Sequence, residues 1–283
     1  MQTEEHVWPV TAPEVQAPEC NDDAYEIVYH RPATMVDVTM HYCPGCAHSL
    51  VHKLIMEVVE DMGIQEQTIG IAPVGCSVFA YDYMNIDMQE AAHGRAAAVA
   101  TAIKRLLPER YVFTYQGDGD LAAIGIAETL HAINRGENIL IVFMNNAVYG
   151  MTSGQMAPTT LPGMKTTTSP DGRDTGFYGS PIKVAELMSQ LPGAFYVTRQ
   201  AVNSAAAVRR TKKALLQAFQ YQQLHKGTCL IEIIGNCPSN WKMTPVEAAR
   251  FIDEEMVKTF PLGDIKLPKA ADLKNIQEDK QSC

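Results

Sequence analysis

The sequence lacks long apolar runs. None reaches the roughly 18 residues that a membrane-spanning helix requires, so no membrane partner is expected. Basic residues are also scarce: 23 Lys and Arg stand against 32 Asp and Glu, giving a net charge of −9, which argues against nucleic acid as the main partner. The N-terminus is acidic and contains prolines, so it does not have the pattern of a signal peptide.

Two common nucleotide-binding loops are missing as well. No Gly-Lys-Ser or Gly-Lys-Thr of a Walker loop occurs, and Ala122 stands where a dinucleotide fingerprint beginning at Gly117 needs its third glycine. Internal repeats and low-complexity tracts are absent. The length and the 46% of hydrophobic residues favour one large α/β domain, which we place at residues 36–258. Residues 1–35 and 259–283 are interpreted as extended arms.

Among the residues that are present, the seven cysteines are the first feature of note. Without a secretory signal they indicate a reducing compartment, and hence a cytoplasmic protein that uses thiols for metal or redox chemistry. Four of them lie where we expect elements to begin or end: Cys43, Cys46, Cys76 and Cys237. Cys229 falls within an expected strand, where it would be a small buried hydrophobe. Cys20 and Cys283 lie in the arms.

The pair in Cys43-Pro-Gly-Cys46 has three possible interpretations. It precedes a helical pattern, so its thiols would lie at a helix N-terminus, where backbone amides stabilise thiolates. A thioredoxin-type redox pair, half of a zinc site and half of an iron–sulfur site all have this spacing. The spacing alone does not choose among them.

The stretch 111–155 predicts a βαβ unit. An apolar strand at 111–115 ends at Gly117-Asp118-Gly119, a helical pattern covers 121–134, and a second apolar strand at 139–144 ends at Asn145-Asn146. Both loops then lie at the carboxyl edge of a parallel sheet, where open α/β sheets bind ligands. The remaining pattern continues this alternation, with strands at 68–72, 195–199 and 228–234. The expected fold is therefore a doubly wound parallel sheet.

The polar groups of these two loops suit a magnesium ion. Asp118 offers a carboxylate, Asn146 offers an amide oxygen, and the backbone after Asn146 can turn a carbonyl inward. Mg²⁺ prefers such oxygen ligands and leaves coordination positions free for phosphates. The glycines at 117, 119 and 150 allow close approach of a diphosphate. An ordinary βαβ turn is the alternative.

The Gly-Asp-Gly followed by Asn-Asn resembles the diphosphate-binding half of thiamine diphosphate enzymes. This resemblance implies that Asp118, the Asn146 side chain and the Val148 carbonyl hold Mg²⁺. It also implies a cofactor-binding set made up of Val74, Gly75, Cys76, Ser77, His93, Gly117, Gly119, Asp120, Asn146, Gly150, Met151 and Thr152.

Six separated motifs make the resemblance more specific. CPGC, VGCS, HGRAAAVATAIK, GDGD, NNAVYGMTSGQ and NCPSNW follow one another as in the β subunits of the 2-oxoacid:ferredoxin oxidoreductases, over roughly residues 40–250. The family implies a coenzyme A-dependent oxidative decarboxylation of a 2-oxoacid (2-oxoisovalerate or 2-oxoglutarate), with electrons passed to ferredoxin. It also implies one [4Fe-4S] cluster on Cys43, Cys46, Cys76 and Cys237. A non-redox thiamine enzyme subunit of the decarboxylase type, with a structural zinc at these cysteines, is the alternative.

Two further residues are candidates for contact with the substrate. His93 opens an expected helix, and the resemblance places it near the thiamine; a structural hydrogen bond at the helix start is the alternative. Lys165 lies in a long polar loop and could meet a substrate carboxylate or the phosphates of coenzyme A. A solvated surface lysine is the other interpretation.

One expected group has no candidate in this chain. Thiamine enzymes use a glutamate against the pyrimidine ring, and the family carries it on a second α/β domain. Glu128 lies within the βαβ helix, too close to the expected metal loop. Glu90 is the nearest rival, but it precedes the helix that begins near His93 and is expected to serve that helix start. The resemblance therefore implies partner subunits of the α and γ type that carry the pyrimidine-binding domain, together with a small ferredoxin-like subunit.

Overall fold

The structure is a computed structural model that describes residues 29–273, and all elements below belong to the unit that begins at Pro32. A seven-stranded sheet has the order β2-β1-β3-β4-β8-β7-β9. Six strands are parallel, and β9 pairs antiparallel with β7. The strands are β1 Thr68–Pro73, β2 Asp87–Ala91, β3 Tyr111–Gly117, β4 Leu140–Asn145, β7 Ala194–Ala201, β8 Thr228–Ile234 and β9 Gly263–Lys266.

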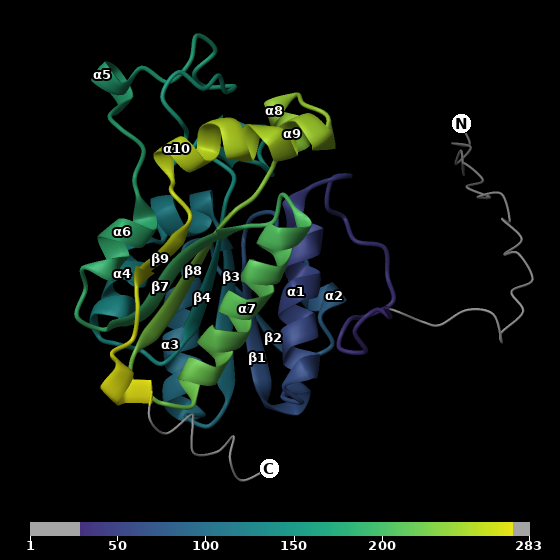
Figure 1. The fold of residues 1–283 in the computed structure, drawn as a ribbon, viewed down its shortest axis with the longest axis vertical. Coiled ribbons are helices and arrows are strands. Elements are labelled where there is room, and N and C mark those ends of the chain that lie inside the picture. Colours follow the sequence, from purple (N-terminus) through teal and green to yellow (C-terminus); the bar gives the residue numbers. More distant parts are fainter. Residues whose placement is uncertain (1–28, 274–283) are drawn as a thin grey trace, which may run out of the picture. The chain divides into compact units, whose positions relative to one another are not determined.

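Helices cover both faces of this sheet (Figure 1). The first face carries α1 (Ala47–Asp61) and α7 (Ala205–Gln222). The second carries α3 (Ala96–Leu106), α4 (Ile126–Asn134) and α6 (Val184–Ser189). The doubly wound α/β fold expected from the sequence is confirmed.

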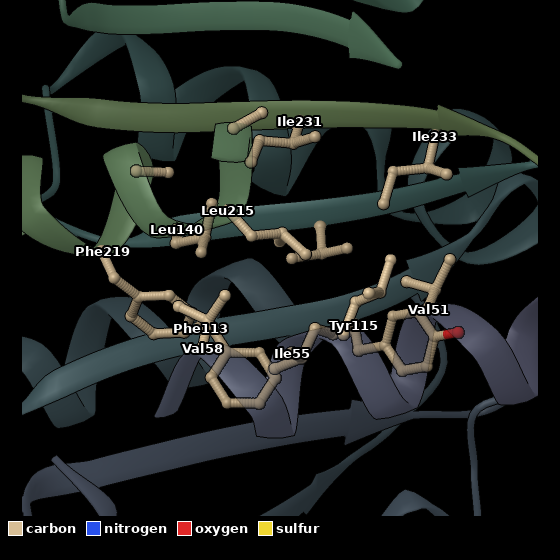
Figure 2. Packing of buried hydrophobic residues seen from close by; sticks show 14 of the residues in the cluster. Val51, Ile55, Val58, Phe113, Tyr115, Leu140, Leu215, Phe219, Ile231 and Ile233 are labelled. Atoms are coloured by element: carbon tan, nitrogen blue, oxygen red, sulfur yellow. The ribbon is translucent and has the colours of Figure 1, made fainter. Parts of the chain in front are cut away.

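The alternation of side chains along the central strands builds the two cores. On β3, Phe113 and Tyr115 point to α1 and α7, whereas Val112 points to the opposite face. Figure 2 shows these rings interleaved with Val51 and Ile55 of α1, and Leu215 and Phe219 of α7 on the same side of the sheet. Because parallel strands are buried on both faces, their sequences are apolar throughout.

The chain changes direction in the sheet between β1 and β3. From β1 it proceeds outward to the edge strand β2, and then returns to place β3 on the other side of β1. Such a switch point opens a crevice at the carboxyl ends of the strands. The loops after β1, β3 and β4 therefore meet at this crevice.

Short elements complete the carboxyl edge. The hairpin of β5 (Val148–Tyr149) and β6 (Gln155–Met156) follows β4, and α5 (Thr175–Tyr178) lies on the long loop beyond it. The helical region after β8 comprises α8 (Pro238–Trp241), α9 (Pro245–Phe251), a π-helix (Ile252–Met256) and α10 (Val257–Thr259). None of the described helices is both long and apolar enough to cross a membrane.

The structure corrects one expectation and adds detail to two others. The single helix predicted at 121–134 is a π-helix (Gly119–Ile124) followed by α4. Part of the predicted C-terminal arm forms the edge strand β9. At the end of the predicted N-terminal arm, Thr34 is buried and donates a hydrogen bond to the Met56 carbonyl. Residues 1–28 and 274–283 of the predicted arms lie outside the described residues, as do Cys20 and Cys283.

Candidate active site

The loops after β1, β3 and β4 enclose a cavity of about 380 Å³. Nearly all the residues predicted to bind a cofactor line it: Val74, Gly75, Cys76, His93, Gly117, Gly119, Asp120, Asn146, Gly150, Met151 and Thr152, together with Asp118. These residues come from four separate stretches of the sequence. The fold therefore gathers into one cavity the motifs that the sequence shows far apart.

Asp118 is the central acidic group of this cavity. Only 4% of it is exposed. Its carboxylate accepts hydrogen bonds from the Gly119 amide at 2.9 Å and from the Thr159 hydroxyl at 3.4 Å. Burial nevertheless raises its pKa from 3.8 to about 7, because these donors compensate only partly for the loss of water. A cation placed here would supply the missing positive charge.

Asp120, two residues further on, also lines the cavity and makes three hydrogen bonds. Its Oδ1 is hydrogen-bonded to His93 Nδ1 at 2.7 Å and to the Gly94 amide at 2.6 Å, and Oδ2 accepts from Gln116 Nε2 at 2.7 Å. Asp120 lines the cavity with both oxygens already occupied. It therefore fixes the ring of His93, whose side chain remains 41% exposed.

A close approach of two backbones explains the interrupted helix at this site. Gly94 has φ +78°, and a Cβ there would lie 2.8 Å from the Gly125 amide; a Cβ on Gly125 would lie 2.4 Å from the Asp120 carbonyl. The π-type hydrogen bond from the Gly125 amide to the Asp120 carbonyl, at 2.9 Å, accommodates this contact. It brings His93 up to the loop after β3, and π-turns of this kind are frequent at functional sites.

A second cavity, of about 200 Å³, lies against the first. It is lined by Cys43, Cys46, Cys76 and Cys237, so the structure brings together the four cysteines selected from the sequence. All four are free thiols, and Cys229 is buried within β8 away from them. Among the described residues, no group of three or more His, Cys, Asp or Glu converges tightly enough to hold a metal ion. The sulfurs thus surround a space instead of meeting at one point.

The electrostatics of these thiols differ from those of a redox pair. The pKa of Cys46 is raised to about 11 and that of Cys76 to about 12, mainly because both thiols are buried and in smaller part because of the neighbouring cysteines. Cys46 does lie at the start of α1, but burial outweighs the helix dipole. A reactive redox thiol needs a lowered pKa, so the thioredoxin-type interpretation is not favoured. Thiols of this kind lose their protons when a metal binds.

The two cavities share a wall. Cys76, Asn146, Gly150 and Met151 line both. A Cβ on Gly150 would lie 3.3 Å from the Cys76 sulfur and 3.5 Å from the Cys237 sulfur, so this position has little room for a side chain. A group bound in one cavity would therefore lie directly beside a group bound in the other.

Three of the predicted residues do not line the first cavity. Ser77 is buried beneath the cavity and donates to the Tyr115 carbonyl at 2.7 Å. Val148 is buried, and its amide donates to the Asn146 side chain at 3.3 Å. Lys165 lines a separate cavity with Trp241 and Phe251, so the described chain does not bring it to Asp118.

Other residues of the first cavity were missed by the sequence analysis. His48, Ala123 and Ile124 line it, and Thr159 reaches Asp118. His48 is buried, hydrogen-bonded to the Tyr115 hydroxyl at 2.8 Å, and burial lowers its pKa to about 4. Its only sequence signal was its position two residues after Cys46, on the buried face of α1.

The fold and the site together define a domain of the thiamine-dependent class. The family described as "Thiamine pyrophosphate enzyme, C-terminal TPP binding domain" matches residues 73–233. The 2-oxoglutarate synthase subunit KorB of Archaeoglobus fulgidus is 34% identical over 213 residues, which cover 75% of each chain. KorB of Methanocaldococcus jannaschii is 33% identical over 82% of this chain and 81% of its own. The chain therefore belongs to the 2-oxoacid:ferredoxin oxidoreductase β-subunit family, as its motifs predicted.

Two other proteins match this chain over different shares of their own length. The ketoisovalerate oxidoreductase subunit VorA of Methanothermobacter thermautotrophicus is 43% identical over 86% of this chain, but the match covers 51% of VorA. The chain thus spans about half the length of that relative. The solved 2-oxoglutarate:ferredoxin oxidoreductase of Magnetococcus marinus superimposes with a TM-score of 0.70 over 91% of this chain and 92% of that one, at 23% identity, which shows that the fold is shared.

Proposed function

We propose that the first cavity binds thiamine diphosphate through Mg²⁺, which is held by the Asp118 carboxylate, the Asn146 side chain and the Val148 carbonyl. The donor set fits this ion because all three ligands are oxygens. The raised pKa of buried Asp118 is a second argument, since a bound cation would stabilise the charged carboxylate. Gly117 leaves open space at the cavity wall, where a Cβ would meet no atom within 4 Å, so a diphosphate could approach the backbone.

A [4Fe-4S] cluster is the group we propose for the second cavity. Four cysteines around a space of about 200 Å³ fit a cluster of eight atoms better than a single zinc ion, which needs its ligands to converge at about 2.3 Å. The Asn240 amide donates to the Cys237 sulfur at 3.2 Å, and such hydrogen bonds tune the potential of a cluster. We therefore do not favour the zinc-containing decarboxylase alternative.

The activity we propose is oxidative decarboxylation of a 2-oxoacid to an acyl-coenzyme A, with electrons passed to ferredoxin. When bound, thiamine diphosphate supplies the chemistry that releases CO₂ from the oxoacid. This chain's residues orient the cofactor, and Cys76 stands in the wall between the cofactor and the cluster. His93, held by Asp120, presents its exposed ring to the cavity and is the residue best placed to meet the substrate. We give no catalytic role to Lys165.

The substrate class is a 2-oxoacid with 2-oxoisovalerate and 2-oxoglutarate as the candidates, following the names of the relatives. The Magnetococcus marinus structure is described with 2-oxoglutarate, coenzyme A and succinyl-CoA bound, which supports coenzyme A as the acyl acceptor. Ferredoxin reduction measured with pyruvate, 2-oxoglutarate and 2-oxoisovalerate would separate the candidates. The cytoplasmic location stays a prediction.

One observation carries this proposal: the cavity that contains Asp118 and Asn146 shares the Cys76 wall with the four-cysteine cavity. The test is Asp118→Ala, with thiamine diphosphate binding measured by calorimetry in excess Mg²⁺. We expect binding to be lost, because no other carboxylate of the described chain with a free oxygen lines the cavity. Asp253→Ala, which removes an exposed carboxylate, should bind normally. Near-normal binding by Asp118→Ala would refute the assignment.

A further inference from the structure

The turn that carries the proposed metal ligands contains a residue in an unfavourable conformation. Ala147, between Asn146 and Val148, has φ +59° and is fully buried. Residues other than glycine, asparagine and aspartate seldom adopt this left-handed region, because Cβ then crowds the backbone. Such conformations persist only where the surroundings hold them, and they concentrate at functional sites.

The surroundings hold this turn through three successive backbone groups. The Trp241 indole N–H donates to the Asn146 carbonyl at 3.1 Å, and the Ala147 amide donates to Asn145 Oδ1 at 3.1 Å. The Thr160 hydroxyl donates to the Ala147 carbonyl at 2.6 Å. Both peptide groups of Ala147 are therefore held by side chains.

Thr160 is itself fixed by burial and by hydrogen bonds. It is fully buried, its hydroxyl also accepts from the Ala157 amide at 2.8 Å, and its carbonyl accepts from Arg173 Nη1 at 2.8 Å. Buried Arg173 also binds the carbonyls of Ala157 and Pro158, so it clamps the segment from which Thr160 projects. The adjacent Thr159 reaches Asp118, so one dipeptide contacts both proposed metal loops.

We propose that Thr160 is a positioning residue for the metal site: its hydroxyl locks Ala147 in the left-handed conformation and thereby presents Asn146 and the Val148 carbonyl to Mg²⁺. This inference rests on the proposed function, because the Mg²⁺ ion that the turn would hold is part of that function. Without the hydroxyl the turn relaxes toward an ordinary conformation, and the ligands must be reassembled each time the ion binds.

The experiment measures the Mg²⁺ concentration that half-saturates thiamine diphosphate binding, followed by calorimetry in the protein purified with its partner chains. Thr160→Val keeps the shape and removes the hydroxyl, so we expect this concentration to rise on the order of tenfold, the loss of about one hydrogen bond. Thr160→Ser should remain within about twofold of the wild type. Thr160→Ala gives the same test if the valine variant is unstable.

Two controls separate positioning from general stability. Thr211 of α7 has an equally buried hydroxyl, which donates to the Ala201 carbonyl at 2.7 Å. Thr211→Val removes this hydroxyl and should leave the Mg²⁺ requirement unchanged. Ala147→Gly removes the strain, so in that background Thr160→Val should lose distinctly less Mg²⁺ affinity. An equal loss in both backgrounds would overturn the proposed mechanism.

The outcomes also distinguish this inference from the proposed function. If Asp118→Ala binds thiamine diphosphate normally, the metal site itself is wrong. If Asp118→Ala loses binding while Thr160→Val keeps the wild-type Mg²⁺ requirement, the site stands and the role of Thr160 is refuted. Both proposals are supported if the Mg²⁺ requirement rises about tenfold in Thr160→Val, stays near the wild-type value in Thr160→Ser, and rises less when Thr160→Val is combined with Ala147→Gly.

Discussion

At the scale of single residues, the site holds a carboxylate that is almost wholly buried in the wall of the cavity. Asp118 is predictable from the sequence because a Gly-Asp-Gly turn after a buried strand puts its side chain at the carboxyl edge of the sheet. Its burial is not predictable, because the walls come from Thr159, Tyr149 and the loop after β1, which are distant in the sequence. The raised pKa is a property of the assembled cavity.

The first prediction follows from that pKa. Between about pH 4 and pH 7 the folded, Mg²⁺-free protein keeps a proton on Asp118 that the unfolded chain has already lost, so stability falls as the pH rises through this window. Asp118→Asn removes this dependence. The measurement is the free energy of unfolding in EDTA, taken as the value for Asp118→Asn minus the value for the wild type. This difference should increase from about pH 5 to pH 7, because only the wild type loses stability there, and it should then level off. A difference that does not change with pH would contradict the assigned burial.

At the scale of elements, the central strands were predictable and the edge strands were not. Expected strands at 68–72, 111–115 and 228–234 match β1, β3 and β8 within two residues, because strands buried on both faces are apolar. The edge strands β2 (Asp-Met-Gln-Glu-Ala) and β9 (Gly-Asp-Ile-Lys) have polar, partly exposed side chains, so no apolar signal marks them. The π-helix was missed because its cause, the contact of Gly94 with Gly125, is a tertiary one.

A buried ion pair links elements next to the turn at Ala147. Arg199 of β7 donates to Glu232 of β8 at 2.9 Å, both side chains are fully buried, and Glu232 accepts from Asn145 of β4 at 2.7 Å. Arg199 also pairs with Glu186 of α6. This chain of contacts joins three neighbouring strands to the residue that holds the Ala147 amide.

The second prediction concerns that pair. Arg199→Met should reduce the free energy of unfolding by about 3–5 kcal/mol, because it leaves the Glu232 carboxylate buried without its charge partner. Denaturant unfolding of the purified chain measures the change. Lys258→Met, which breaks the exposed pair with Glu255, is the matched control and should have little effect. A loss below about 1 kcal/mol in Arg199→Met would show that Glu232 is neutral in the folded protein.

At the scale of the whole molecule, the cavity has the features of half a site. Val74, Ile124 and Met151 line it yet are 39%, 50% and 49% exposed, which is unusual for apolar residues grouped at one opening. No glutamate lines the cavity within residues 29–273: Glu90 is exposed on β2, and Glu128 pairs with Arg95. A partner carrying the pyrimidine-binding domain would cover the apolar rim and supply that group.

The third prediction is that the isolated chain is inactive. Loaded with cluster, Mg²⁺ and thiamine diphosphate, it should show no 2-oxoacid-dependent dye reduction, because none of the glutamates in residues 29–273 lines the cavity. Adding the partner chains should restore activity in a complex that contains at least two copies of each. Turnover by the isolated chain at the rate of the complex would show that the carboxylate is here, and Glu90→Gln would then be the variant to examine.

In the arrangement we propose, a cluster and a thiamine site share the wall at Cys76, and the metal content of the protein tests this arrangement. The measurement is iron, acid-labile sulfide and zinc per chain in anaerobically purified wild type, Cys76→Ser and Cys229→Ser. We predict about four irons and four sulfides in the wild type and in Cys229→Ser, whose altered thiol lies within β8, and a marked loss in Cys76→Ser. Stoichiometric zinc without iron, or unchanged iron in Cys76→Ser, would contradict the account.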